Sequence, residues 1–260
     1  MKDSGTFVFF VYFCTTNMNR YFISFQYDGT AYHGWQVQPN GNSVQAELQE
    51  ALSKLLRKKC EVVGAGRTDA GVHASKMVAH LDLEESIDCE QVAYRLNRIL
   101  PHDIAVLGIS LVAPDMHARF SAVERTYHYY IHTQKDPFAC RYSCLIPYAL
   151  DFELMNEAGS ILTTYEDFGA FCKSHTDVKT TLCHVTKAQW EQLSPHRYRF
   201  TITANRFLRN MVRAVVGTLI DVGRGKISLE EFRSIIESRQ RTQAGESMPA
   251  HALFLNDVKY

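Results

Sequence analysis

A glycine-rich segment in the first third of the chain holds the side chains best suited to chemistry. Residues 64–71 read Gly-Ala-Gly-Arg-Thr-Asp-Ala-Gly, with three glycines in eight positions. Such a segment lets backbone approach a ligand closely and holds polar side chains at the end of a strand. Asp69 follows Arg67 by two residues, and a nearby guanidinium favours the ionised carboxylate that a nucleophile requires. The same spacing also fits a turn whose polar side chains only bond their own backbone.

This segment lacks the marks of a phosphate-binding loop. Its glycine spacing fails the dinucleotide fingerprint, it has no Gly-Lys-Ser/Thr ending, and the residues after it have the pattern of a strand rather than a helix. The sequence therefore indicates a reactive carboxylate here and not a nucleotide cofactor.

A second candidate lies in the alternating run from Arg125 to Thr133, which predicts a strand. Alternation places Arg125, Tyr127, Tyr129 and Ile131 on one face. A tyrosine on this face could lie flat against a nucleobase or take a proton from it. Aromatic residues are also ordinary strand formers, so simple packing is the alternative.

A third candidate is an amphipathic helix predicted over residues 207–222. Its expected buried stripe consists of five apolar residues, Leu208, Met211, Val212, Val215 and Leu219. Arg206, Arg209 and Arg213 fall together along the edge of this stripe. Three adjacent guanidiniums suit a phosphate backbone or a carboxylate, although a charged stripe can also be a merely solvated face.

Composition limits the class of protein. The 260 residues are 46% apolar and 22% charged, as in an ordinary globular protein. Lys and Arg total 28, as do Asp and Glu, which excludes a uniformly basic nucleic-acid coat. Residues 179–241, however, contain 12 Lys or Arg and only 5 Asp or Glu. A local basic surface is therefore expected in the second half of the chain.

The seven cysteines have irregular spacing in a chain long enough to build its own core. We therefore expect reduced thiols in a cytoplasmic protein and no disulfide framework. His128 and His132 precede Cys140 and Cys144, but the two histidines fall on a predicted strand. Residues four apart on a strand are roughly 13 Å apart, too far to share a zinc ion, so no metal site is predicted.

Two α+β domains are expected, one over residues 19–114 that carries the Asp69 loop and one over residues 115–260. Each is expected to resemble an α/β sandwich with a mainly antiparallel sheet, and a basic cleft is expected between them. Residues 104–112 are apolar on both faces and predict a central strand. Residues 1–18 form an expected N-terminal extension, too short in its apolar run to span a membrane. Met18 is the expected natural start. The remaining strands are predicted at 20–27, 60–64, 76–83, 125–133, 185–190, 198–203 and 253–260, and helices at 44–56, 90–100, 151–162, 207–222 and after Ser228.

The run from Gly64 to Ala74 resembles the active-site signature of the TruA family of tRNA pseudouridine synthases. Further matches occur in the family's order, at 27–30, 34–36, 97–103, 117–122, 125–127, 207–222 and 251–254. The resemblance covers the chain from about Asn19 to Tyr260, and only the N-terminal extension falls outside it.

This resemblance implies roles for individual residues. Asp69 would be the nucleophile, and Tyr127 would pack on the target base and accept its C5 proton. Arg213 would pair with the catalytic carboxylate. Arg67 would help to hold the displaced nucleotide. The basic helix, with Arg206 and Arg209, would contact the tRNA.

The resemblance also implies a substrate and partners. The expected reaction converts uridine to pseudouridine in the anticodon stem-loop, at tRNA positions 38 to 40, in a cytoplasmic homodimer. Because this isomerisation carries no electron, hydride or phosphoryl group, neither a metal nor an organic cofactor is expected. The alternative is a non-catalytic tRNA-binding protein or chaperone on the same scaffold. A metal-dependent RNA hydrolase is disfavoured, because the sequence lacks the carboxylate cluster it would need.

Overall fold

The structure is a computed structural model that describes residues 18–39, 41–173 and 179–260. Residues 1–17 of the predicted N-terminal extension lie outside the described residues. The expected start at Met18 directly precedes the first strand, β1, which spans Asn19–Tyr27.

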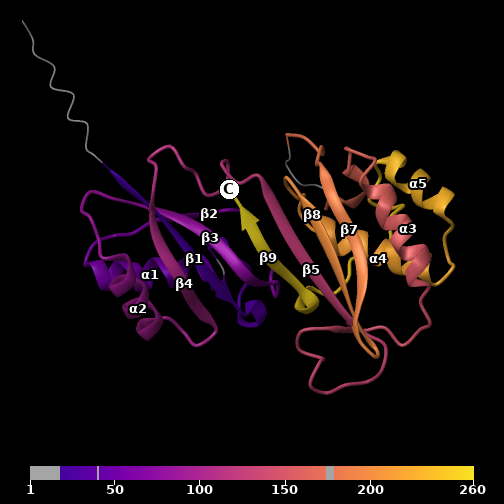
Figure 1. Cartoon of the computed structure of the whole chain (residues 1–260), viewed down its shortest axis with the longest axis horizontal. Helices are drawn as coiled ribbons and strands as arrows, with labels where there is room; N and C mark the ends of the chain where they lie inside the picture. Colours follow the sequence, from indigo (N-terminus) through magenta and orange to yellow (C-terminus); the bar gives the residue numbers. More distant parts are fainter. Residues whose placement is uncertain (1–17, 40, 174–178) are drawn as a thin grey trace, which may run out of the picture.

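The described strands form one nine-stranded sheet (Figure 1). Its main order is β4-β1-β3-β9-β5-β8-β7, with β2 added beside β3 and β6 beside β5. The β3–β9 and β5–β6 pairs are parallel, and the remaining pairs are antiparallel. The strands after β1 are β2 Val62–Gly64, β3 His73–Leu83, β4 Ile104–Val112, β5 Glu124–His132, β6 Cys144–Leu145, β7 Val185–Ser194, β8 Arg197–Ala204 and β9 Leu253–Lys259.

The mixed, largely antiparallel α+β architecture is confirmed, but the expected separate sheets merge into one. The C-terminal strand β9 joins them, because it pairs with β3 from the first half and with β5 from the second. Sequence periodicity predicts each strand separately and does not show which distant strands pair with one another in the sheet.

Five helices accompany the sheet in the described residues. They are α1 Val44–Leu56, α2 Cys89–Ile99, α3 Phe152–Leu162, α4 Met211–Gly223 and α5 Leu229–Ser238. Ser43, Asp88, Asp151 and Ser228 cap the first turns of α1, α2, α3 and α5 with their side chains, as N-cap residues do. None of the described helices is long and apolar enough to span a membrane.

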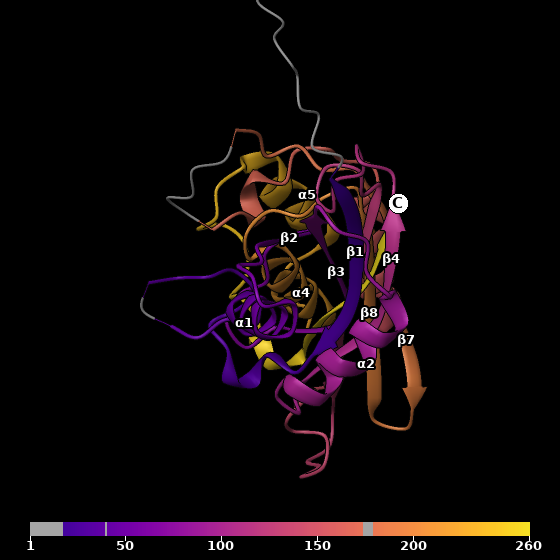
Figure 2. The ribbon, with the colours of Figure 1, turned by 90° about the vertical axis from the view of Figure 1, so that its left-hand side faces the viewer.

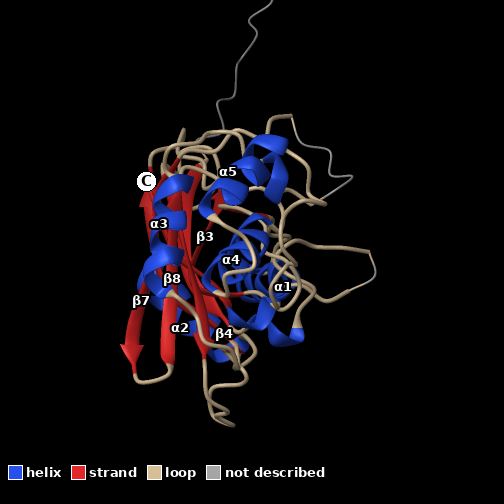
Figure 3. Cartoon of the chain, turned by 90° about the vertical axis from the view of Figure 1, so that its right-hand side faces the viewer, coloured by secondary structure: helices blue, strands red, loops and turns tan. Residues whose placement is uncertain are grey.

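Two hydrophobic clusters stabilise the fold. The first packs α1 and α2 on the N-terminal strands around Phe25, Trp35 and Leu48. The second packs α3, α4 and α5 on β5, β7 and β8 around Phe200 and Phe232. β9 adds Leu255 and Val258 to the first cluster although it comes from the end of the chain. The helices α1, α4 and α5 lie on the same side of the sheet (Figures 2 and 3).

The prediction that residues 104–112 form a central strand is wrong, because β4 lies at the edge of the sheet. Leu107 and Leu111 are 52% and 61% exposed there. A strand that is apolar on both faces is usually central, but the same pattern also occurs on an edge strand that leaves apolar side chains uncovered.

The predicted amphipathic helix also differs from the observed α4. The helix begins only at Met211, so Arg206 and Arg209 lie in the segment before it. Its side chains are buried nearly all round, from Ala214 to Ile220 without interruption. Helical wheels assume that a helix lies on a surface, whereas α4 is enclosed by α3, α5 and the segment before β9.

Candidate active site

The Asp69 loop joins β2 to β3 and is fixed by the segment that follows β1. At Gly29 a Cβ would collide with the carbonyl oxygen of Val72, and at Gly34 (φ +93°) with that of Thr68. Two glycines therefore allow the two backbones to touch. The Tyr27 hydroxyl and Thr68 Oγ1 form a buried hydrogen bond of 2.9 Å. The loop that carries Asp69 is thus held in place before any ligand arrives.

Two arginines from the second half of the chain face Asp69. Arg213 Nη1 lies 3.5 Å from Asp69 Oδ2, and Arg209 Nε lies 4.0 Å from Oδ1. The Asp69 side chain remains 27% exposed, so it is accessible to a substrate. Two guanidiniums from the second half of the chain thus face a carboxylate that could act as a nucleophile.

Arg213 is positioned by the segment that precedes β9. Its Nε donates to the Met248 carbonyl oxygen at 2.5 Å, and the Met248 N–H donates to the Arg213 carbonyl at 3.1 Å. This contact requires Gly217 in α4, where a Cβ would collide with the carbonyl oxygen of Glu246. The close approach of backbone to helix therefore aims the guanidinium at Asp69.

Tyr127 lies on β5 between Ile202 of β8 and Leu255 of β9. Its ring packs edge-on against Phe207, with centroids 5.0 Å apart and planes at 83°. Burial, and secondly the negative charge of Asp69, raise the pKa of Tyr127 well above its ordinary value. Both causes favour the neutral phenol, so Tyr127 carries its proton at neutral pH.

The other two candidate arginines, Arg67 and Arg206, form no ion pair with Asp69 in the described residues. The Arg67 side chain is exposed, and in the described part of the chain it has no recorded hydrogen bond or ion pair. Among the described residues, the cations within 4.0 Å of the Asp69 carboxylate are Arg213 and Arg209. Arg206 makes long contacts, at 3.4 and 3.5 Å, with the carbonyls of Thr180 and Leu182. A two-residue spacing in a bent loop does not bring side chains together.

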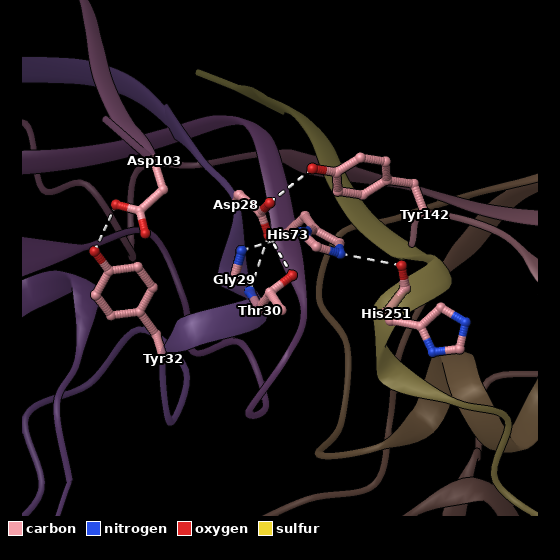
Figure 4. Close-up of polar contacts among 8 residues, drawn as sticks. All are labelled: Asp28, Gly29, Thr30, Tyr32, His73, Asp103, Tyr142 and His251. Atoms are coloured by element: carbon pink, nitrogen blue, oxygen red, sulfur yellow. Dashed lines mark hydrogen bonds and ion pairs between the residues drawn. The ribbon is translucent and has the colours of Figure 1, made fainter. Parts of the chain in front are cut away.

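His73 closes the loop at its other end (Figure 4). Its Nδ1 accepts the Gly29 N–H at 3.0 Å, and its Nε2 lies 3.0 Å from the His251 carbonyl oxygen. Since Nδ1 is an acceptor here, Nε2 carries the proton and donates to His251. Burial lowers the pKa of His73, consistent with this neutral form, despite Asp28 Oδ1 at 3.0 Å from Nδ1. His73 therefore ties the loop to the segment that holds Arg213.

Sequence reasoning missed several of these supporting residues. Tyr27, Gly34 and Met248 make the contacts that position Asp69 and Arg213. Tyr27 and Gly34 lie in the stretches 27–30 and 34–36, which match the family pattern. The resemblance therefore marked these positions, although residue spacing alone did not show what they do. Met248 has no such signal, because it acts through its backbone carbonyl, which any residue provides.

No group of three or more His, Cys, Asp or Glu side chains with metal-site geometry occurs in the described ranges. The two histidines considered for zinc both lie on β5. His132 Nδ1 lies 2.9 Å from Ser143 Oγ, and His128 Nδ1 lies 3.4 Å from the Tyr130 hydroxyl.

Comparison with known proteins assigns the chain to a family. The model of a family described as tRNA pseudouridine synthase matches residues 23–121 and 165–260. The chain therefore belongs to the tRNA pseudouridine synthase family, whose members are isomerases that act on tRNA.

Individual relatives agree with this assignment. The chain is 57% identical over 245 residues to a tRNA pseudouridine synthase A of Bacteroides fragilis, covering 94% of this chain and 97% of that protein. The corresponding protein of Bacteroides thetaiotaomicron is 56% identical, with 94% and 91% covered. That of Bacillus subtilis is 41% identical over 238 residues, with 90% and 96% covered.

Proposed function

We propose that this chain isomerises uridine to pseudouridine in tRNA, with Asp69 as the nucleophile. The observation that carries the proposal is the placement of Asp69 against Arg213 and Arg209, in a loop whose charge also acts on Tyr127. An accessible carboxylate, a guanidinium pair and a neutral tyrosine are the groups that this reaction needs.

The reaction is balanced without an external reagent. The Asp69 carboxylate attacks either C1′ of the ribose or C6 of the base, and the N1–C1′ bond breaks. The uracil rotates, and C5 bonds to C1′. This step displaces Asp69 if it had attacked C1′, whereas after attack at C6 the carboxylate leaves C6 as the C5 proton is lost. The C5 proton is then lost and N1 gains a proton, so no electron pair leaves the nucleoside and no redox partner is required.

Tyr127 is the proposed route for the C5 proton. Because its pKa is raised, the phenol is neutral and can accept that proton only as it passes its own proton on. The Asp69 carboxylate, once released from the nucleoside, is a suitable acceptor. The ring of Tyr127, braced by Phe207, would lie against the target base.

The arginines have different proposed tasks. Arg213 orients the Asp69 carboxylate. Arg209, exposed and at the longer distance, would contact the tRNA together with Arg206 in a basic cleft between the halves 19–114 and 115–260. Arg67 has no partner recorded in the described residues, and this leaves it available to hold the displaced nucleotide. Opening the helical stack costs a few kcal/mol, which such contacts offset.

We further propose that the target uridines lie in the anticodon stem-loop, at tRNA positions 38 to 40, and that the enzyme acts as a cytoplasmic homodimer. The support for these details is the similarity to the family. The local excess of Lys and Arg between residues 179 and 241 supports contact with tRNA in general.

Tritium release from tRNA labelled with [5-³H]uridine tests the proposal. The wild-type protein should release tritium, and the position of the product in each tRNA should map to the anticodon stem-loop. Binding of tRNA without any release would instead support the non-catalytic alternative, a tRNA-binding protein or chaperone on the same scaffold.

A further inference from the structure

The guanidinium of Arg125, at the start of β5, binds four backbone carbonyl oxygens. Its Nη1 donates to Ala122 at 2.8 Å and to Asn205 at 2.6 Å. Its Nη2 donates to Ala65 at 3.1 Å and to Arg119 at 2.6 Å. A guanidinium has two N–H groups on each terminal nitrogen, so all four terminal donors are used.

The four carbonyls belong to three segments that are distant in the sequence. Ala65 begins the loop that carries Asp69. Asn205 follows β8 and begins the basic segment that carries Arg209 and leads to α4. Arg119 and Ala122 lie in the connection between β4 and β5. Arg125 itself is two residues before Tyr127 on the same face of β5. One side chain therefore links the Asp69 loop, the segment that carries Arg209 and the strand that carries Tyr127.

We infer that Arg125 is a positioning residue, which fixes the distance between the Asp69 loop and the Tyr127 strand. This inference rests on the proposed reaction at Asp69. It assigns to Arg125 neither contact with the substrate nor a place among the catalytic groups.

Two features distinguish this role from tRNA binding. The terminal N–H groups are already engaged, which leaves only Nε to reach a phosphate. Arg125 also has no recorded ion pair among the described residues, and burial lowers its pKa. An arginine that is partly withdrawn from water and held by neutral carbonyls serves the backbone and not an incoming anion.

The planar fork makes the role specific to arginine. Lysine presents three donors from one nitrogen, so it cannot reach four carbonyls that lie around the edge of a planar guanidinium. The Arg125→Lys variant keeps the charge and most of the packing but loses the simultaneous link between the three segments. Active sites tolerate such displacement poorly, since a 1 Å misplacement can lower a rate by about 100-fold.

The test is single-turnover kinetics with saturating enzyme and labelled tRNA, together with the tRNA Kd and the melting temperature. Arg125→Lys should lower the single-turnover rate by roughly 10- to 100-fold while the Kd changes by less than about threefold. The matched control is Arg224→Lys, in which an exposed arginine stacked on Tyr148 is changed and the rate should stay at the wild-type value.

A second variant makes the result independent of a folding defect. In Arg125→Gly, millimolar methylguanidinium should restore part of the rate, whereas methylammonium should not. If this variant does not fold, Arg125→Lys alone decides. The inference would be overturned by a wild-type rate in Arg125→Lys or by a defect of that variant in tRNA affinity instead of rate. Equal rescue of Arg125→Gly by methylguanidinium and methylammonium would also overturn it. An inactive wild-type protein would instead refute the proposed function, so the two failures are distinguishable.

Discussion

Arg213 and Asp69 come from opposite halves of the chain, and Arg213 Nη1 lies 3.5 Å from Asp69 Oδ2. Their side chains are 22% and 27% exposed, so water screens the pair and it contributes little to the stability of the fold. Its importance lies in orientation. The carboxylate is held in one place by a guanidinium that is itself anchored to the Met248 carbonyl.

Replacing Arg213 with Gln should lower kcat by about 100-fold, because the charge that orients the Asp69 carboxylate is lost. Arg209→Gln provides the comparison. Arg209 is 58% exposed and 4.0 Å from Asp69, so its loss should lower kcat by less than about tenfold and act mainly on tRNA affinity. Steady-state kinetics of the two variants measures this difference, and equal effects on kcat would refute the assignment.

Tyr127→Phe should keep the ring against Phe207 but remove the hydroxyl that carries the C5 proton. We expect pseudouridine formation to fall by at least about 100-fold, as for the loss of a general acid–base group, with tRNA affinity unchanged. Tyr165→Phe is the control, because its hydroxyl bonds Glu237 on α5 and has no proposed part in proton transfer. Product formation in Tyr127→Phe near the wild-type rate would exclude Tyr127 from proton transfer.

Gly217→Ala should destabilise the protein by about 1–3 kcal/mol, the range for forced overpacking. The added Cβ would collide with the Glu246 carbonyl and push the segment with Met248 away from Arg213. Urea denaturation measures the change in the free energy of unfolding. Gly108→Ala is the matched control, since no atom lies within 4 Å of a Cβ there, and its stability should not decrease.

Acid should weaken the fold through buried histidines. Burial is the main cause that lowers the pKa of His80 and of His128 to about 4. The unfolded chain therefore binds protons on these groups from about pH 6.5 downward, while the folded protein does not. The free energy of unfolding should be constant above pH 7 and fall between about pH 6.5 and 4.

Urea unfolding across this pH range tests the histidine effect. His80→Gln should reduce the slope of stability against pH, because one of the two groups no longer titrates. His196→Gln is the control, as His196 is exposed in the turn between β7 and β8. A slope that His80→Gln leaves unchanged would show that other groups dominate acid unfolding.

The sequence was most informative where local chemistry decides structure. The helices predicted at 44–56, at 151–162 and after Ser228 are confirmed, and Ser43, Asp151 and a Ser228–Glu231 capping box cap their first turns. Caps are local, because a side chain bonds a backbone N–H within one turn. The strand periodicities were similarly sufficient to find β1, β5 and β9.

Properties that depend on distant segments were not predictable in this way. The edge position of β4 and the enclosure of α4 follow from which elements pack beside them. Spacing alone pointed to Arg67 as the cation beside Asp69, because it is near in sequence, whereas the family resemblance pointed to Arg213, which is near in space. The family signature indicated Arg213 without explaining how Met248 and Gly217 aim it.

The role of Asp69 as the nucleophile is tested most directly with the isosteric variant Asp69→Asn, which keeps the shape of the loop but removes the negative charge. We would measure pseudouridine formed in a single turnover on bound tRNA, with tRNA affinity determined in parallel. We expect wild-type tRNA affinity and no pseudouridine. Product formed by Asp69→Asn at a rate near that of the wild type would contradict this expectation.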